Sequence, residues 1–375
     1  MSFFKFHSYY CGLLKSVTTL AIVSAVGLSA CMEKQVAPDL PKTMMADYTT
    51  EVLAEGLDTP WAFASLPGGG FLITERGGTL KRVQNGETTI ITGLPDDIFV
   101  GNQAGLFDVM LSADFVENNF LYLSYARGTE AENGTAVIVA ELDGDKLINI
   151  SEVFTANPLK SGAAHFGGSL SFLPGGTVAL STGDGFEFRE AAQDRKSDLG
   201  KIIKLTPPPA QNISIGHRNV QGLFFDPFTN SLWAHEHGPR GGDELNLIQP
   251  GENYGWPIVS QGLDYNGAKI TPLTEMAGMS DPVHVWTPSI APSGLIIYRG
   301  GMFPEWNGDA IVGGLASRDV RRVDLENGIA VGEEILFSDI NARVRDVDMG
   351  FDGSLLVLAV DGENSRLIRF IPKQD

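Results

Sequence analysis

The sequence predicts an all-β protein built as a six-bladed β-propeller, and three observations support this prediction. Helix-period stretches are scarce after about residue 42, whereas short β-rich runs separated by Gly, Asp, Asn and Pro dominate. Apolar hairpins recur along the chain at intervals of roughly 45–80 residues, as the blades of a propeller do. About 330 residues of such hairpins fit one propeller better than several β-sandwiches, which are the main structural alternative.

The recurring unit is an apolar strand, a turn rich in Pro, Gly, Asp or Asn, and a second apolar strand. We expect each of six copies to supply one blade. Four copies are clear, at 63–74, 170–181, 223–234 and 347–360, and two are looser, at 109–125 and 297–314. The irregular segment 251–292 is a candidate for the long loops that propellers gather at one end of the central channel, where active sites open.

Residues 1–30 are typical of a bacterial secretory signal of the lipoprotein type. Lys5 and Lys15 are followed by an apolar stretch that is too short for a membrane-spanning helix with polar flanks. Cys31 follows Leu-Ser-Ala, as the lipidated cysteine of a lipobox does. An ordinary cleaved signal with a chance cysteine is the alternative.

This leader predicts where the protein resides and how the chain is divided. We expect an exported, periplasmic protein whose only membrane contact is a lipid on Cys31. A tether over residues 31–42 would then join the lipid to a single propeller domain over residues 43–375. The chain has two cysteines, Cys11 and Cys31, so the propeller has no internal disulfide and must gain its stability from a large core.

The formal net charge of −19 argues against a nucleic-acid partner, because nothing in the sequence resembles a basic stripe. Two arginines nevertheless stand one residue apart, at Arg343 and Arg345. Positions i and i+2 of a strand point to the same side, which predicts a pair of guanidinium groups on one face. Guanidinium binds carboxylate and phosphate through a planar fork of donors, so the pair favours an anion site. Two surface arginines with the acidic neighbours Asp346 and Asp348 are the alternative.

A histidine and an aspartate flank one of the clear hairpins. His165 precedes the hairpin 170–181, and Asp184 follows it. A histidine on a loop and an aspartate at the end of the paired strand can meet. Such a contact fixes the imidazole tautomer and raises its basicity, which suits a general base. A histidine that caps a turn is the alternative interpretation.

The segment from His235 to Pro257 carries several groups that bind metal ions. His235 and His237 form a His-x-His pair, which can bind a transition metal. The lack of cysteine, the nearby acidic side chains and the bent Gly-Pro backbone favour oxygen ligands instead. Calcium is the natural hard cation for an exported protein, and a network of turns is the alternative.

Two further motifs are weak when they are taken alone. The run 216–222 places a cation and an amide side by side at Arg218 and Asn219, and either could instead bind loop carbonyls. The glycine-rich run 101–107 places Gln103 before a strand. No helix start or lysine follows this run, so a nucleotide-binding P-loop is not indicated.

Taken together, these runs resemble the pyrroloquinoline quinone (PQQ)-dependent aldose sugar dehydrogenases, relatives of soluble quinoprotein glucose dehydrogenase. The resemblance covers nearly the whole chain after the leader, and the order and number of the runs make it specific. The matching runs are 57–62, 74–78, 101–106, 164–168, 216–222, 236–257 and 341–346. The family fold is a six-bladed β-propeller, in agreement with the hairpins counted above.

The resemblance implies an activity and a role for each matching residue. It implies oxidation of the anomeric carbon of aldoses to lactones, with His165 as the general base and Asp184 as the carboxylate that orients it. PQQ carries three carboxylates, which would explain a cationic pocket in an acidic protein. The residues implied to hold it are Gln103, Arg218, Asn219, Arg343 and Arg345, with Trp286 as an aromatic beside its plane.

The resemblance also implies calcium. Gly238 and Pro239 match backbone carbonyls that bind the calcium in contact with the quinone, where the ion acts as a Lewis acid. Glu244 and Tyr254 match a second, structural calcium site of the aldose branch, Tyr254 through its main chain.

The chain also departs from the family pattern. Ala316 stands where the soluble glucose enzymes have a lysine, which removes one cation, and Arg318 is a candidate replacement. The loops are shorter than in the glucose enzymes, which favours the aldose branch and a more open site. Substrate preference therefore does not follow from the resemblance.

Two other functions remain open from the sequence. One is a calcium-dependent propeller hydrolase such as a lactonase, and the other is a non-catalytic propeller that binds a sugar or a protein. The arginine pair disfavours the first, because cations near the metal repel it, and the presence of both His165 and Asp184 disfavours the second. The sequence does not define the physiological sugar, the electron acceptor, or whether the protein is a monomer or a dimer.

Overall fold

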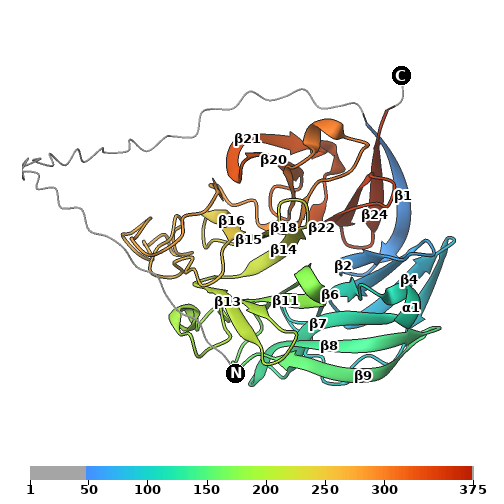
Figure 1. Ribbon diagram of the computed structural model, residues 1–375, viewed down its shortest axis with the longest axis horizontal. Coiled ribbons are helices and arrows are strands. Elements are labelled where there is room, and N and C mark those ends of the chain that lie inside the picture. The colour runs from blue at the N-terminus through green and yellow to red at the C-terminus, as the bar shows by residue number, and fades with distance from the viewer. Residues whose placement is uncertain (1–47, 374–375) are drawn as a thin grey trace, which may run out of the picture. The chain divides into compact units, whose positions relative to one another are not determined.

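The computed structural model describes residues 48–373, which form six sheets of four antiparallel strands each (Figure 1). Blades 1 to 3 follow one another along the chain. Blade 1 contains β2 (Pro60–Ser65), β3 (Phe71–Glu75), β4 (Thr79–Gln84) and β5 (Glu87–Ile91). Blade 2 contains β6 (Leu106–Leu111), β7 (Phe120–Gly128), β8 (Asn133–Asp143) and β9 (Lys146–Thr155). Blade 3 contains β10 (Gly167–Leu173), β11 (Thr177–Thr182), β12 (Lys201–Lys204) and β13 (Gln211–Ile215).

The second half of the chain continues the series and closes it. Blade 4 contains β14 (Val220–Asp226), β15 (Ser231–Glu236), β16 (Asp243–Ile248) and β17 (His284–Trp286). Blade 5 contains β18 (Pro292–Ile297), β19 (Ala310–Gly314), β20 (Val320–Glu326) and β21 (Ile329–Leu336). Blade 6 contains β22 (Arg343–Met349), β23 (Leu355–Val360), β24 (Ser365–Pro372) and β1 (Tyr48–Leu57).

Helices in the described residues are short. They are α1 (Phe115–Asn118) and the 3-10 turns η1 (Pro174–Gly176), η2 (Arg189–Gln193), η3 (Pro304–Trp306) and η4 (Ser338–Ile340). No helix in the described residues is long and apolar enough to cross a membrane. The predicted secretory signal, the tether and the lipidation site Cys31 lie outside the described residues.

The predicted all-β, six-bladed architecture is confirmed. Each of the six hairpins recognised in the sequence is the pair formed by the first and second strands of one blade, for example β10 with β11 and β22 with β23. Gly, Asn and Asp supply the turns because several of these positions have a left-handed backbone, as at Asn230 and Gly353.

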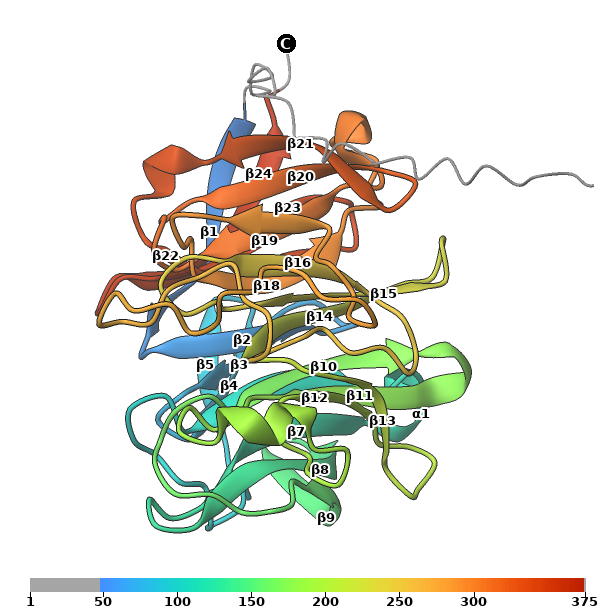
Figure 2. The same ribbon diagram turned by 90° about the vertical axis from the view of Figure 1, so that its left-hand side faces the viewer.

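The ring is closed by a strand from the other end of the described chain. β1 pairs with β24, from Tyr48 opposite Pro372 to Leu57 opposite Ser365, and so becomes the outermost strand of blade 6. Figure 2 shows β1 beside β24, with blade 1 between blade 6 and blade 2. Hydrogen bonding between distant segments therefore fixes the ring.

The first strand of every blade lines the central channel. In Figure 1 the labelled innermost strands β2, β6, β14, β18 and β22 surround the centre of the ring. The channel contains a cavity of about 140 Å³, lined by Asp108, Arg345, Asp346 and Asp348 among others. Burial raises the pKa of Asp108 to about 7 and that of Asp348 to about 6, so the channel wall carries less charge than its sequence implies.

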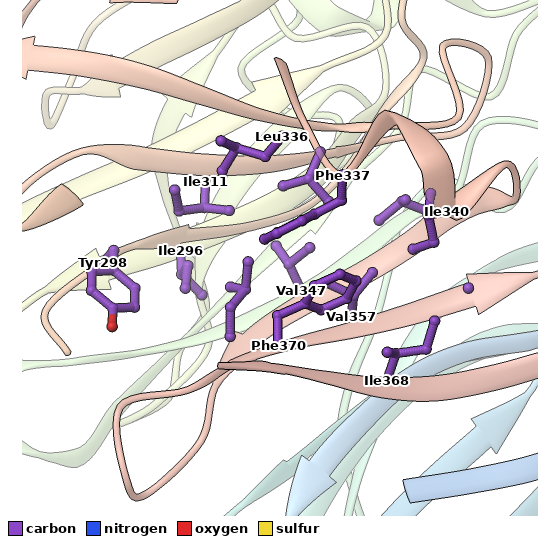
Figure 3. Packing of buried hydrophobic residues seen from close by; sticks show 14 of the residues in the cluster. Ile296, Tyr298, Ile311, Leu336, Phe337, Ile340, Val347, Val357, Ile368 and Phe370 are labelled. Carbon is purple, nitrogen blue, oxygen red and sulfur yellow. The ribbon is translucent and has the colours of Figure 1, made fainter. Parts of the chain in front are cut away.

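Apolar side chains fill the spaces between adjacent blades. The largest cluster joins blade 5 to blade 6 and is shown in Figure 3. Within it, the Phe337 ring packs on Phe370 at 3.9 Å between centroids, and Tyr48 of β1 meets Phe337 edge-on at 4.6 Å. The closing strand is thus held by side-chain packing as well as by backbone hydrogen bonds.

We expect Ile368→Val to destabilise the protein by about 0.5–1.5 kcal/mol, because it removes a buried methylene from this cluster. Ile368 is 4% exposed and lies on β24, opposite Val52 of β1. Ile329→Val is the matched control, since Ile329 is 65% exposed and should change stability by less than about 0.5 kcal/mol. The midpoints of urea unfolding measure both, and equal midpoints for the two variants would contradict the assigned packing.

Candidate active site

Loops from different blades meet at one end of the channel, which we call the channel mouth. The innermost strands begin at this end, and each second strand returns to it because it runs antiparallel to the first. Residues that precede an innermost strand or follow a second strand therefore come together. The predicted site residues at these positions are Gln103, His165, Asp184, Arg218, Asn219, Gly238 and Pro239.

His165 and Asp184 form a buried hydrogen-bonded pair at the mouth. His165 Nδ1 lies 2.7 Å from Asp184 Oδ1, and the two residues are 4% and 0% exposed. The indole N–H of Trp256 donates to Asp184 Oδ2 at 2.7 Å, and the backbone N–H of Phe186 donates to Oδ1 at 2.8 Å. Asp184 is therefore fully engaged as an acceptor, which fixes the orientation of the imidazole.

The backbone around His165 is held in an unusual conformation. His165 has a left-handed backbone with φ of 55°, and Gln103 Oε1 accepts its N–H at 2.9 Å. A side chain at Gly183 would place its first carbon 2.2 Å from the His165 carbonyl oxygen, so only glycine permits this close approach. This contact brings the loop before β10 against the end of β11.

Burial and neighbouring charges determine which member of the pair carries the proton. Burial lowers the pKa of His165, opposed by Asp184 and reinforced by the positive charges of Arg218 and Lys160. Burial acts to raise the pKa of Asp184, but the hydrogen bond and charge of His165 outweigh it and the net shift is downward. A neutral imidazole beside an ionised carboxylate is therefore the favoured state near pH 7. His165 Nε2 makes no hydrogen bond within the described residues and is free to accept a proton.

Arg218 points its guanidinium at backbone oxygens beside the pair. Its Nη1 donates to the carbonyl oxygens of His237 and Gly238 at 3.0 and 2.8 Å, and its Nη2 donates to the Tyr265 hydroxyl at 3.3 Å. The adjacent Asn219 accepts the N–H of Gly167 through Oδ1 at 3.2 Å. Arg218 thus holds the backbone after β15, and Asn219 holds the start of β10.

The arginine pair differs from the sequence prediction in one respect. The register of β22 shifts between Val344 and Asp346, so a bulge at Arg345 interrupts the regular strand that we expected. Arg343 is exposed, whereas Arg345 is 9% exposed. The bulge removes the regular two-residue alternation from which the guanidinium pair was predicted, but the charge of Arg343 still acts on Arg345.

Arg345 is held by neighbours but keeps an unused donor. Its guanidinium lies 3.3 Å from the centroid of the Trp61 ring, and its Nη2 donates to Gln221 Oε1 at 2.9 Å. Its buried Nε has no hydrogen-bond partner among the described residues. Burial, reinforced by the charges of Arg343 and Arg76, lowers the pKa of Arg345 to about 9. The unpaired donor makes Arg345 a candidate to bind an anion.

The neighbourhood of Arg343 contains one more arginine. The charge of Arg318 lowers the pKa of Arg343, after burial as the larger cause, so the two side chains lie near each other. Arg318 is exposed and has a left-handed backbone with φ of 60°, and Ala316 is exposed two residues before it. Arg318 therefore adds positive charge near Arg343, and Ala316 has no charge to contribute there.

Trp286 lies in different surroundings from those expected. It belongs to β17, the outermost strand of blade 4, and packs with Trp233 and Leu295 between blades 4 and 5. Its indole N–H donates to Glu333 Oε1 at 3.0 Å. The Trp286 ring is thus buried between blades 4 and 5, and its place beside a cofactor stays a prediction. Trp61 and Trp256 are the tryptophans in contact with the residues of the mouth.

A second cluster of oxygen atoms lies behind the mouth, around a cavity of about 10 Å³ lined by Gly238, Pro239, Glu244 and Tyr254 among others. Glu244 faces Glu236 across β15 and β16, and burial together with the Glu236 charge raises the pKa of Glu244 to about 8. Both carboxylates accept from the side-chain amide of Asn246, whose buried Oδ1 has no partner. The donor set is hard oxygen, as calcium prefers.

The structure disfavours the His-x-His pair as a transition-metal site. His235 Nε2 and His237 Nε2 lie 2.9 and 2.8 Å from the carbonyl oxygens of Gly294 and Pro292. Burial lowers the pKa of both imidazoles. No group of three or more His, Cys, Asp or Glu side chains that could hold a metal occurs in residues 48–373. Any cation here would depend on backbone carbonyls as well.

The protein-family model for glucose/sorbosone dehydrogenase matches residues 57–369, almost the whole propeller. This chain belongs to the glucose/sorbosone dehydrogenase family. The recognition made from the sequence motifs is therefore confirmed.

Individual members of the glucose/sorbosone dehydrogenase family support this assignment. An uncharacterized protein of Synechocystis sp. (slr1608) is 39% identical, over 94% of this chain and 97% of that protein. The aldose sugar dehydrogenase YliI of Escherichia coli is 36% identical, over 88% of this chain and 94% of YliI. A PQQ-bound aldose sugar dehydrogenase of Streptomyces coelicolor superimposes with a TM-score of 0.71 at 27% identity, covering 87% of this chain and 99% of that one.

Several residues of this family member's mouth were not identified from the sequence. Trp256 contacts Asp184 across 72 residues of chain, and Gln221 and Trp61 reach Arg345 from other blades. The run that contains Trp256 was recognised as a motif, and an indole N–H that must be satisfied was the available signal. Lys160 stands five residues before His165, and no sequence motif pointed to it.

Proposed function

We propose that this protein oxidises the anomeric carbon of aldose sugars to lactones, with PQQ as cofactor and His165 as general base. The family supports a sugar dehydrogenase of the PQQ type. The observation that carries the proposal is the buried His165–Asp184 pair, whose free Nε2 opens at the channel mouth beside Arg218. A neutral imidazole held by a carboxylate is the arrangement that proton abstraction requires.

The residues at the mouth fit a quinone that carries three carboxylates. Arg345 offers a buried Nε with no partner within the described chain, and Arg218 and Arg343 add positive charge. Gln103 and Asn219 would contribute amide groups. When bound, PQQ supplies the acceptor for the hydride that leaves the anomeric carbon.

The protein's own part in the reaction is to hold the sugar and move one proton. His165 Nε2 accepts the proton of the anomeric hydroxyl, which leaves the oxygen with the electron pair that forms the lactone carbonyl. The imidazolium that results is stabilised by Asp184, whose second oxygen is held by Trp256. Phe186 lies beside the base: its ring meets the His165 ring edge-on at 5.0 Å between centroids, and the side chain is 40% exposed.

We also propose that calcium binds here, at the carbonyls of Gly238 and Pro239 and at a second site that includes Glu244 and Tyr254. The donors fit a hard cation, since Asn246 Oδ1 is unpaired and two carboxylates face each other. Arg218 already donates to the Gly238 oxygen, which retains a second lone pair for a cation.

We expect calcium to raise the melting temperature more at pH 8 than at pH 5. The folded-state pKa of Glu244 is raised from 4.5 to about 8, so the metal-free fold loses stability as pH rises through this window. Bound calcium offsets the repulsion between Glu236 and Glu244. Glu244→Gln should therefore raise the melting temperature in chelator at pH 8 and reduce the calcium response.

Thermal unfolding with calcium or chelator at both pH values measures these effects. Glu326→Gln is the control, because Glu326 is exposed on β20 and should leave the calcium response unchanged. An undiminished calcium response in Glu244→Gln would remove Glu244 from the site.

The activity is tested by adding PQQ and calcium to purified protein and following the reduction of a redox dye with a panel of aldoses. We expect dye reduction that requires both the quinone and an aldose with a free anomeric hydroxyl. A folded protein that binds PQQ by absorbance titration but reduces no dye with any aldose would overturn the proposal. Lactone hydrolysis without quinone would instead indicate a propeller hydrolase.

A further inference from the structure

Lys160 is a buried lysine that has no carboxylate partner. It is 4% exposed, and its Nζ donates to Asn133 Oδ1 at 2.9 Å and to the Gly162 carbonyl oxygen at 3.0 Å. The ammonium also lies 3.9 Å from the centroid of the Phe166 ring. Its three donor directions thus meet neutral groups, and it makes no salt bridge within the described residues.

The side chain lies against both halves of the His165–Asp184 pair. Phe166, under the ammonium, is the residue after His165. Gly185, the residue after Asp184, packs so closely on the lysine stem that a side-chain carbon there would lie 2.4 Å from Lys160 Cδ. Lys160 therefore contacts the two backbone segments that carry the pair.

Burying an ammonium group without a carboxylate partner costs desolvation free energy. Burial lowers the pKa of Lys160 to about 8, and Asp184 is the charged group that opposes this shift. A methionine could fill a similar volume without the desolvation penalty. The charged groups that act on His165 are Asp184, Arg218 and Lys160, and the two cations oppose protonation of its ring.

We propose that Lys160 is a positioning residue for the sugar oxidation: its ammonium holds the loop that carries His165 against the segment that carries Asp184, and so places a fixed positive charge beside the base. This inference rests on the proposed function for its catalytic meaning. The effect of the Lys160 charge on His165 can be measured in the folded protein without cofactor or substrate. Lys160 stays protonated throughout the pH range in which His165 titrates.

The test compares Lys160→Met with Lys160→Arg and with Lys201→Met. Lys201 is a matched control: it is 0% exposed and donates to the carbonyl oxygens of Ala191, Ala192 and Leu199, but Asp194 and Asp198, not Asp184, are the carboxylates that act on it. In cofactor-free protein with labelled histidine, NMR follows the titration of the His165 ring. We expect its midpoint to rise by roughly 0.5–1 pH unit in Lys160→Met, to return toward the native value in Lys160→Arg, and to stay unchanged in Lys201→Met.

The loaded enzyme supplies a second readout. The acid limb of the pH profile of kcat/KM should move to higher pH in Lys160→Met by the same amount as the NMR midpoint. An unchanged His165 midpoint in folded Lys160→Met overturns the proposal, as does an equal shift in Lys201→Met. If Lys160→Met fails to fold, Lys160→Gln is measured in its place, since it keeps a polar group while removing the charge. The NMR result decides the inference even if no aldose is oxidised, so failure of the proposed function is distinguished from failure of this inference.

Discussion

His165→Ala is expected to lower kcat with aldoses by roughly 10²–10⁴-fold while PQQ affinity changes by no more than a few-fold. The imidazole is the group with a free, neutral nitrogen at the channel mouth, and its other nitrogen is committed to Asp184. Removing it deletes the proton acceptor but leaves every arginine of the mouth in place. The effect should therefore appear in kcat rather than in cofactor binding.

Dye-coupled steady-state kinetics and absorbance titration of PQQ measure the two quantities separately. His284→Ala is a suitable control, because His284 lies on β17, the outermost strand of blade 4, and should leave kcat unchanged. If His165→Ala keeps kcat within threefold of the native value, His165 is not the base.

Arg345→Gln is expected to weaken PQQ binding by about 10²-fold or more. Arg345 is buried, and loss of one partner from a buried, hydrogen-bonded charge pair typically costs about 2–5 kcal/mol. Arg343→Gln is the natural comparison, since Arg343 is exposed and its charge is screened by water and salt. We therefore expect a loss of no more than about tenfold for Arg343→Gln.

The ratio of kcat/KM between two aldoses gives the second half of this test. A group that holds the cofactor should leave this ratio unchanged once the enzyme is saturated with quinone. A changed ratio with undiminished quinone affinity would assign Arg345 to the sugar instead. Circular dichroism of both variants controls for the loss of the contact between Arg345 and Trp61.

The blades could be predicted from the sequence because each hairpin is a local pattern. An apolar run, a turn and a second apolar run are adjacent in the chain, and the turn residues predict where the chain reverses direction. The closing strand β1 could not be found in this way, because its partner β24 lies at the other end of the described chain. Pairing at that distance leaves no periodic mark in either segment.

The same distinction separates the site residues that were identified from those that were missed. His165 and Asp184 flank one hairpin, so the topology alone brings them together. Trp256 and Lys160 reach the pair from loops whose paths no local rule predicts. The bulge at Arg345 lies within blade 6 and the Trp286 ring is buried between blades 4 and 5, and no local sequence pattern predicts either feature.

The closure of blade 6 by β1 has a consequence for how the protein is made. Arg369 of β24 bonds Glu51 of β1 across a separation of 318 residues, so the ring cannot be completed until nearly the last strand has emerged from the ribosome. Until then β1 has no partner and the edge of the unfinished blade is exposed. The ring therefore closes last, through both ends of the described chain together.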